Sequence, residues 1–387
     1  MARASVFQVP ICLAHLRDLG LLRLFGRPQV DRCCDHPPVP TQLRLGVLDQ
    51  SPVAEGSSRS QALRNTLDLA ALADRRGYHR YWVAEHHGAA LLAGTSPEAL
   101  IGPIAALTSQ IRVGSGGVML PHYSPFKVAE TFSVLSGLFP ERIDLGIGRT
   151  DGTDDPIPVF ALQRDRNHPA LDDFGSQLTE LLAYLHSGFP AEHPFTGLPA
   201  LLPGRPEGPA PWLLGSSAQS AVWAAQLGLP YAFADFINPG GGVDIVKLYR
   251  ERFTASERLR VPRVLVAVWA LCADSAEEAD ALAASARMVA VLARRGTSVP
   301  VPPVQTALQF VQRRAGEAVP ARAPGKRMVV GAPAAVRDDL QQLAADYGVD
   351  ELLVVTVTHE HLARRRSYEL LADAFALVGE RDAASDP

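Results

Sequence analysis

The sequence has little cysteine, and its few cysteines are not spaced for cross-links or metal binding. Four of its 387 residues are cysteines and none of them falls in a CxxC pair; they are Cys12, Cys33, Cys34 and Cys272. A disulfide framework or a structural zinc site would need regularly spaced pairs. We therefore expect free thiols in a reducing cytoplasm and no bound metal.

Long apolar runs and an excess of one charge are also absent. No run approaches the roughly 18–20 apolar residues that cross a bilayer. The most apolar N-terminal stretch, residues 9–22, is interrupted by proline and charged residues, so we expect neither a membrane span nor a signal peptide. The 37 basic residues nearly balance the 41 acidic ones. No strongly basic face is required, and nucleic acid is not an expected partner.

The first part of the chain differs from the rest. Residues 1–42 show little hydrophobic periodicity and end in a proline-rich segment, a composition that buries little apolar surface. Hydrophobic residues make up 47% of the whole chain, which is ample for one large core. We predict a poorly structured extension over residues 1–42 and one folded domain over residues 43–380.

From residue 43 onward, apolar runs of strand length alternate with helix-length amphipathic segments, which is typical of βα units and a parallel sheet. The runs predicted as strands are Leu43–Asp49, Tyr81–Ala84, Ile111–Leu120, Arg142–Ile147, Trp212–Leu214, Tyr231–Phe236, Arg263–Ala270 and Leu352–Val357. They predict an α/β fold, a single (β/α)8 TIM barrel with insertions after the fourth and seventh strands. The alternative, an open doubly wound sheet, would need a glycine-rich turn after the first strand. Residues 49–56 do not provide one.

Polar residues gather at the predicted strand ends, where barrel enzymes build their sites. The second strand is followed by Glu85-His86-His87. Because side chains alternate along a strand, Glu85 and His87 should lie on one side and His86 on the other. The three residues are candidates for catalysis, while a structural role for both histidines is a second interpretation. A metal site is a third, with ligands at other strand ends that show no metal-ligand spacing: Asp49, Asp151, Asp154 and His359.

Four ordered segments at the second to fifth strands resemble a known family. They are residues 80–87 (RYWVAEHH), 113–121 (VGSGGVMLP), 142–149 (RIDLGIGR) and 215–220 (GSSAQS). Together with the closing segment 331–353, they resemble the luciferase-like, flavin-dependent monooxygenases, over about residues 43–377. Within that family the chain is most similar to the subgroup that includes oxygenases of natural-product pathways.

The resemblance implies an activity as well as a barrel. It implies an FMNH₂-dependent monooxygenase that uses O₂ to oxygenate a small organic substrate through a flavin C4a-hydroperoxide. The sequence lacks a glycine-rich NAD(P)H fingerprint, which favours a two-component system with a separate flavin reductase. The resemblance also implies a homodimer.

The resemblance assigns the phosphate of FMN to the ends of the fourth and fifth strands. Arg149 resembles the family's phosphate-binding arginine, and Ser216, Ser217 and Ser220 match positions that bind the same phosphate. A guanidinium and the N–H groups at a helix start suit a dianion. The alternative interpretation of the serines is plain N-capping of the helix.

Three glycines are assigned to the flavin ring. Gly116 and Gly117 match a bulge that lies against the isoalloxazine in the family, although close packing inside the protein would equally require glycine. Gly148 stands where luciferases carry a reactive cysteine. This departure implies more space beside the ring and argues against light emission.

His86 matches the family's active-site histidine, which assists the hydroperoxide chemistry, with His87 and Glu85 orienting it or packing on the barrel. Residues 296–325 match the position of a mobile lid, and an ordinary surface loop is the alternative. Three other functions are considered: an F420-dependent oxidoreductase on the same barrel, a non-catalytic flavin-binding subunit, and a metal-dependent hydrolase.

Overall fold

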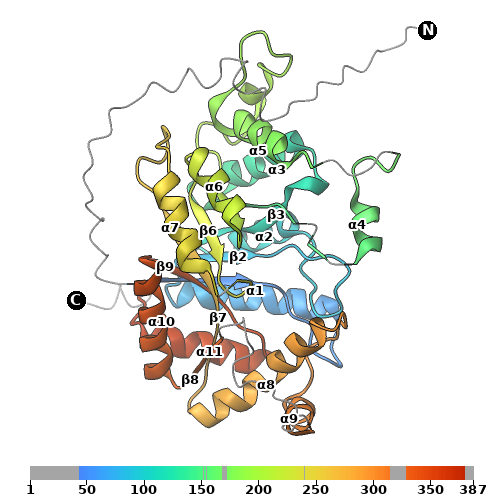
Figure 1. Cartoon of the computed structure of the whole chain (residues 1–387), viewed down its shortest axis with the longest axis vertical. Helices are drawn as coiled ribbons and strands as arrows, with labels where there is room; N and C mark the ends of the chain where they lie inside the picture. Colours follow the sequence, from blue (N-terminus) through green and yellow to red (C-terminus); the bar gives the residue numbers. More distant parts are fainter. Residues whose placement is uncertain are drawn as a thin grey trace.

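A closed barrel of parallel strands forms the centre of the protein (Figure 1). The computed structural model of the chain describes residues 43–150, 152–153, 155–167, 172–238, 240–313 and 328–379. Within these residues each strand pairs with the next from β1 to β7, β7 pairs with β9, and β9 closes the ring on β1. The wall consists of β1 (Arg44–Asp49), β2 (Arg80–Val83), β3 (Arg112–Met119), β4 (Ile143–Gly148), β5 (Ala210–Gly215), β6 (Tyr231–Ala234), β7 (Val264–Cys272) and β9 (Glu351–Val355). The predicted TIM barrel is confirmed; the extension predicted over residues 1–42 lies outside the described residues.

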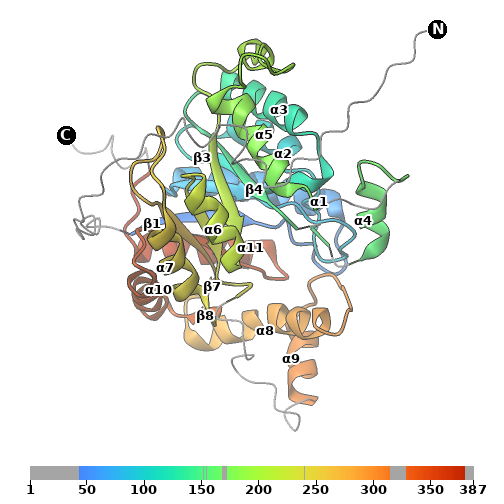
Figure 2. The same ribbon diagram turned by 45° about the horizontal axis from the view of Figure 1, so that its top comes forward.

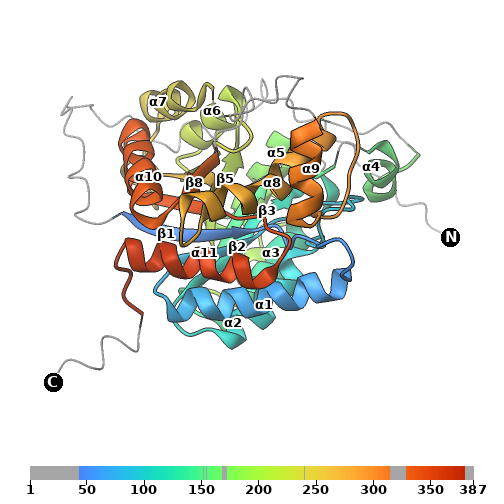
Figure 3. The same cartoon turned by 90° about the horizontal axis from the view of Figure 1, so that it is seen from below.

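Helices between the strands cover the outside of the barrel. They are α1 (Arg59–Arg75), α2 (Pro97–Leu107), α3 (Pro125–Leu138), α5 (Phe174–Leu182), α6 (Ala218–Gln226), α7 (Gly242–Arg252), α8 (Ala276–Ala293), α10 (Pro333–Tyr347) and α11 (His361–Ala374). Figure 3 shows α1 between α2 and α11 on one side of the strands. Serine caps start several helices: the Ser58 hydroxyl accepts the N–H of Gln61 at 3.1 Å at the start of α1. None of the helices in the described part of the chain combines the length and apolarity needed to cross a membrane.

Additional elements interrupt the regular alternation. Short helical turns lie at Leu120–His122, Ala183–Ser187 and Leu198–Leu201. Helix α4 (Pro156–Leu162) follows β4, contains no buried residue and projects from the side of the barrel (Figures 1 and 2). After β7 come α8, α9 (Val304–Arg313) and β8 (Met328–Gly331).

Strand β8 was not predicted, and the predicted eighth strand corresponds to β9. Strand β8 is short and pairs only with the end of β7, from Trp269 to Cys272. The region predicted as a lid includes α9, which the sequence pattern did not indicate; residues 314–325 lie outside the described part.

The inside of the barrel is filled by alternate residues of its strands. Leu48, Trp82, Trp212, Leu265 and Leu353 belong to one buried apolar cluster within the wall. The rings of Trp82 and Trp212 meet edge to face with centroids 5.7 Å apart. The intervening residues of each strand face the helices, so the two-residue period of the sequence separates the inner core from the outer one.

A buried ion-pair network closes the N-terminal end of the barrel. Arg80 is 1% exposed and donates to Asp144 at 2.5 Å and to Glu351 at 3.1 Å. Arg263 donates to the same Glu351 carboxylate at 3.4 Å. Burial would raise the pKa of Glu351, but the charge of Arg80 outweighs it and holds the pKa below its usual value. This network keeps the N-terminal end closed and leaves the C-terminal mouth for a ligand.

Replacing Glu351 with Ala is expected to lower the free energy of unfolding by about 3–5 kcal/mol, because it leaves the buried Arg80 charge short of partners. Urea denaturation of the purified protein measures this loss. The adjacent Asp350→Ala is the control, since Asp350 pairs with Arg44 in a half-exposed bridge worth less than about 1 kcal/mol. Equal losses in both variants would mean that the network stabilises no more than a surface pair.

Candidate active site

The motif Glu85-His86-His87 follows β2 at the C-terminal mouth, and its side chains separate as predicted. Glu85 is fully buried and accepts three hydrogen bonds: from His87 Nε2 at 2.8 Å, from the Tyr123 hydroxyl at 2.7 Å and from the Met119 N–H at 2.9 Å. These bonds tie the end of β2 to the end of β3. Glu85 and His87 therefore fix the ends of β2 and β3 relative to each other. The Glu85 carboxylate itself is buried and is not exposed at the mouth.

His86 lies apart from that pair. Its backbone N–H donates to the carbonyl of Gly94 at 2.8 Å, but its ring Nδ1 is buried without a hydrogen-bond partner among the described residues. Burial, with a smaller contribution from the nearby His87, lowers the pKa of His86 to about 4. The imidazole is therefore neutral near pH 7, with one nitrogen to donate and one to accept a hydrogen bond. An unpartnered buried nitrogen of this kind is suited to a ligand.

The glycine run in β3 forms an irregularity in the barrel wall. The register of β3 against β4 shifts between Ser115 and Val118, and the Gly116–Gly117 peptide bond is cis. A Cβ on Gly117 would lie 2.8 Å from the carbonyl oxygen of Gly146, and one on Gly116 would lie 3.2 Å from Trp82 Cβ. Both positions are closed to a side chain by the protein itself. Close packing is thus sufficient to require glycine here, whatever lies above the bulge.

Gly148 ends β4, and the space beside it is already filled. A Cβ added to Gly148 would lie 2.8 Å from Met119 Sδ. The expectation of extra room at this position is wrong, because the Met119 side chain occupies it. The thioether also accepts a hydrogen bond from the Thr150 hydroxyl at 3.4 Å.

Arg149 follows directly and extends toward helix α6. Its guanidinium lies 5.0 Å from the ring centroid of Trp223 on α6 and donates to the exposed Asp172 carboxylate at 3.1 Å. The side chain of Arg149 is 44% exposed. An exposed ion pair contributes little free energy, so Arg149 can exchange Asp172 for a ligand anion at small cost.

The predicted serines lie where β5 turns into α6. Ser217 is the exposed N-cap of α6, and its hydroxyl accepts the N–H of Ser220 at 3.4 Å. The hydroxyl of Ser220 is buried and lies 3.0 Å from the Tyr231 hydroxyl. The carbonyl of Ser216 accepts from the Asn238 side chain at 2.9 Å. The start of α6 is therefore exposed at Ser217 and partly exposed at Ser216, while Ser220 is buried against Tyr231.

Arg149 contacts Trp223 of α6, and Ser217 is the N-cap of the same helix. The structure therefore brings the predicted arginine and serine to one helix. Sequence reasoning missed Trp223, Met119, Tyr123 and Asn238. Trp223 has no local signal, because an aromatic residue inside a helix usually belongs to the core. Tyr123 follows the strand end beside Glu85, and only the fold reveals their contact.

Two other polar residues at strand ends, Asp49 and Asp235, contact the outer helices. Asp49 is fully buried and accepts from Arg364 at 2.7 Å, while Asp235 accepts from the Tyr347 hydroxyl at 2.6 Å. His359 lies between Glu360 and the carbonyl of Glu55. In the described part of the chain no three His, Cys, Asp or Glu residues are placed to hold a metal ion; Asp151 and Asp154 lie outside it.

Comparison with known proteins gives a consistent result over the whole domain. The sequence profile of the luciferase-like monooxygenase family matches residues 43–351. The chain is 40% identical over 332 residues to a luciferase-like monooxygenase of Escherichia coli (strain K12), covering 86% of this chain and 96% of that protein. It is 35% identical over 342 residues to the N-acetyl-S-alkylcysteine monooxygenase of Bacillus subtilis (strain 168), covering 86% and 98%.

Solved structures share the same architecture. The crystal structure of apo-MsnO8 has a TM-score of 0.79 and 42% identity, covering 87% of this chain and 100% of that one. Two more distant structures share the fold alone. They are the oxygenating constituent of 3,6-diketocamphane monooxygenase from Pseudomonas putida with FMN (20% identity, TM-score 0.65, covering 87% and 99%) and an F420-dependent secondary alcohol dehydrogenase (13%, 0.60, covering 87% and 99%).

Proposed function

This chain belongs to the luciferase-like monooxygenase family, and we propose that it binds reduced FMN at the C-terminal mouth and uses O₂ to oxygenate a small organic substrate. The observation that carries the proposal is the buried, unpartnered Nδ1 of His86 at this mouth. It marks a polar contact that the protein leaves for a ligand. The exposed start of α6, with Arg149 along its flank, offers the charge that a ligand phosphate requires.

These residues fit FMN in a simple division of roles. Arg149, the α6 N–H groups and the hydroxyls of Ser216 and Ser217 hold the phosphate. The ring lies toward the bulge at Gly116 and Gly117 and the end of β4 at Gly148. Ser220 supports the phosphate site from behind, because its hydroxyl is engaged with Tyr231.

When bound, reduced FMN supplies the activation of O₂ at its C4a position. The protein's own contribution lies in its side chains. His86 donates a hydrogen bond to the oxygen being transferred, because its neutral ring near pH 7 keeps one N–H for this role. Glu85 and His87 hold the end of β2 so that His86 keeps its place. The apolar barrel interior excludes water below the ring.

The proposal includes two protein partners. A separate flavin reductase supplies the reduced FMN, and two copies of the chain form a homodimer. The named substrate of the B. subtilis relative, an N-acetyl-S-alkylcysteine, makes a thioether a reasonable first substrate to test. Under this proposal one oxygen atom of O₂ enters the organic product and the other leaves as water.

Anaerobic titration of the purified protein with FMNH₂ and with reduced F420 tests the cofactor. We expect saturable binding of FMNH₂ and, on admission of O₂ and an N-acetyl-S-alkylcysteine, incorporation of one ¹⁸O atom into product. Preferential binding of F420 with hydride transfer would favour the oxidoreductase alternative. Tight FMNH₂ binding without oxygen-dependent turnover of any substrate would favour a non-catalytic subunit.

A further inference from the structure

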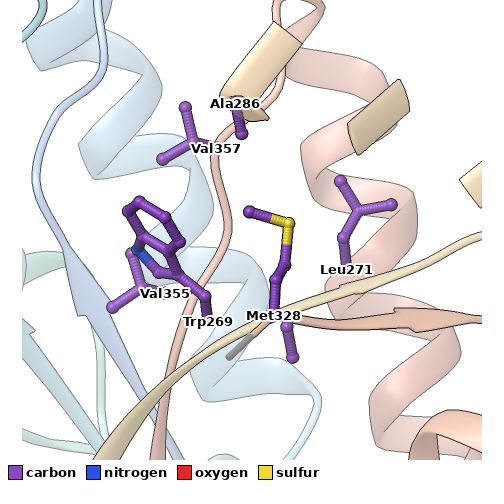
Figure 4. Close-up of a pocket in the computed structure, with 7 residues that line it drawn as sticks. Trp269, Leu271, Ala286, Met328, Val355 and Val357 are labelled. Atoms are coloured by element: carbon purple, nitrogen blue, oxygen red, sulfur yellow. The ribbon is translucent and has the colours of Figure 1, made fainter. Parts of the chain in front are cut away.

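The wall of the barrel leaves little free space where β7 changes partners. A cavity at this place has a volume of about 10 Å³, which is room for at most one water molecule. Figure 4 shows the apolar side chains around it, which are Trp269, Leu271, Ala286, Met328, Val355 and Val357. This cavity is too small for a ligand, so the surroundings of His86 depend on the loops at the mouth.

The loop after β2 closes on His86. It runs over residues 88–94 (GAALLAG), and its side chains carry no polar group. The carbonyl of its last residue, Gly94, accepts the backbone N–H of His86 at 2.8 Å. A Cβ on Gly94 would lie 3.0 Å from the carbonyl oxygen of Ala84, so this residue packs directly on the end of β2. The loop thus begins and ends at the active-site motif.

The loop relies on neighbouring elements for its hydrogen bonds, because its own side chains can form none. Two backbone bonds join it to the segment after β1. The Val53 N–H donates to the Leu91 carbonyl at 2.8 Å, and the Ala93 N–H donates to the Ser51 carbonyl at 2.9 Å. These bonds attach one half of the loop to the neighbouring strand end.

Arg59, the first residue of α1, bonds to both halves of the loop. Its guanidinium donates from Nη1 to the Leu92 carbonyl and from Nη2 to the Ala89 carbonyl, both at 2.7 Å. Such short, charge-assisted bonds are among the stronger hydrogen bonds in proteins. The planar guanidinium can address two carbonyls at once, which the single ammonium of a lysine does less well. Arg59 therefore links the residues on either side of the loop's tip.

From these contacts we propose that Arg59 is a positioning residue for His86, because it clamps the loop 88–94 that encloses the imidazole. The inference rests on the proposed function, which gives His86 its role in oxygen transfer. Arg59 acts through the loop, whose Gly94 carbonyl holds the His86 backbone. Without the clamp the loop should loosen and admit water to the ring. Water would then compete for the hydrogen bond that His86 offers to the transferred oxygen.

Arg59→Met tests the clamp, since methionine keeps an apolar stem and removes both donors. Arg59 is exposed, so the substitution leaves the core intact. With water admitted to the ring, the pKa of His86 should rise from about 4 toward its ordinary 6.5. NMR titration of the flavin-free protein measures this pKa, and His86→Asn identifies the resonance. The neighbouring His87 also lowers this pKa, but its bond to Glu85 is expected to persist in the variant.

The same variant should yield about 5–10-fold less oxygenated product per flavin oxidised, because small displacements of a reacting group are costly. Its FMN affinity should stay within about twofold of the wild type. Arg64→Met is the matched control: Arg64 is exposed on the same helix and donates to Gln61, so both readouts should be unchanged. Arg59→Lys should give intermediate values, and it keeps the test available if Arg59→Met folds poorly.

An unchanged pKa of His86 in both Arg59 variants would overturn the inference. A raised pKa with wild-type product yield would also overturn it, since the loop would then enclose His86 without affecting oxygen transfer. The NMR titration needs neither flavin nor O₂. Failure of the oxygenase proposal would therefore appear separately, in the FMNH₂ titration.

Discussion

Replacing His86 with Ala is expected to lower the rate of product formation at least ~100-fold while leaving FMN affinity within about twofold of the wild type. Among the described residues, the buried Nδ1 of this imidazole has no hydrogen-bond partner in the protein. Reduced flavin should still be oxidised, so hydrogen peroxide should replace the oxygenated product. Product yield per flavin oxidised measures this uncoupling.

His87→Ala is the comparison for that result. His87 bonds to Glu85 and stacks edge to face near His122, so its loss should reduce thermal stability more than product yield. If His86→Ala retained wild-type coupling, the hydrogen-bonding role proposed for His86 would be wrong. If both variants lost coupling equally, the effect could not be assigned to His86 alone and would belong to the whole segment Glu85–His87.

The low pKa of His86 adds a pH dependence of stability with a defined sign. The pKa is about 4 in the folded protein and about 6.5 in an unfolded chain. Between these values the unfolded state binds a proton that the folded state does not, so stability falls as the pH falls, by up to about 1.4 kcal/mol per pH unit. His86→Asn removes this contribution. The unfolding free energy of the wild type minus that of the variant should therefore decrease from pH 7 to pH 4.5, as followed by urea denaturation.

Arg149→Met is expected to weaken FMNH₂ binding about 10–100-fold, because a charge-assisted contact to the phosphate is lost. Riboflavin, which lacks the phosphate, should bind the variant and the wild type equally. Anaerobic fluorescence titration with both flavins measures the difference. Equal losses for FMN and riboflavin would show that Arg149 does not act on the phosphate.

A second arginine separates this effect from a general loss of positive charge. Arg366 is 46% exposed and pairs with Asp274, much as Arg149 is 44% exposed and pairs with Asp172. Arg366→Met should leave the affinity for both flavins unchanged. Neither variant should lose more than about 1 kcal/mol of stability, because both arginines form exposed pairs.

The barrel itself could be predicted because its signals are local. Apolar runs such as that of β7 and the serine cap of α1 record the backbone conformation of their own segment. The separation of His86 from Glu85 and His87 was predicted for the same reason, since alternation along a strand depends on no distant residue. Strand β8 lacked such a signal: it is four residues long and exists because the end of β7 extends past β9.

The phosphate site shows the same limit. Ser217 was predicted at a helix start, where it is found, but its neighbour Ser220 turns inward because Tyr231 from the next strand lies 3.0 Å away. The space expected beside Gly148 is filled by Met119 of the neighbouring strand. In both cases a residue distant in the sequence decided whether a group faces the mouth.

The sequence by itself determined the order of the eight strands that form the barrel wall. It also determined the strand ends that carry polar residues, and that Glu85 and His87 face the side of the strand opposite to His86. Local backbone geometry sets all of these. Only the tertiary structure decided that Glu85 is buried and satisfied, that His86 Nδ1 is left without a partner, and that Arg149 lies against the helix capped by Ser217. These outcomes depend on which strands become neighbours when the barrel closes, and the resulting contacts join residues that no local pattern connects.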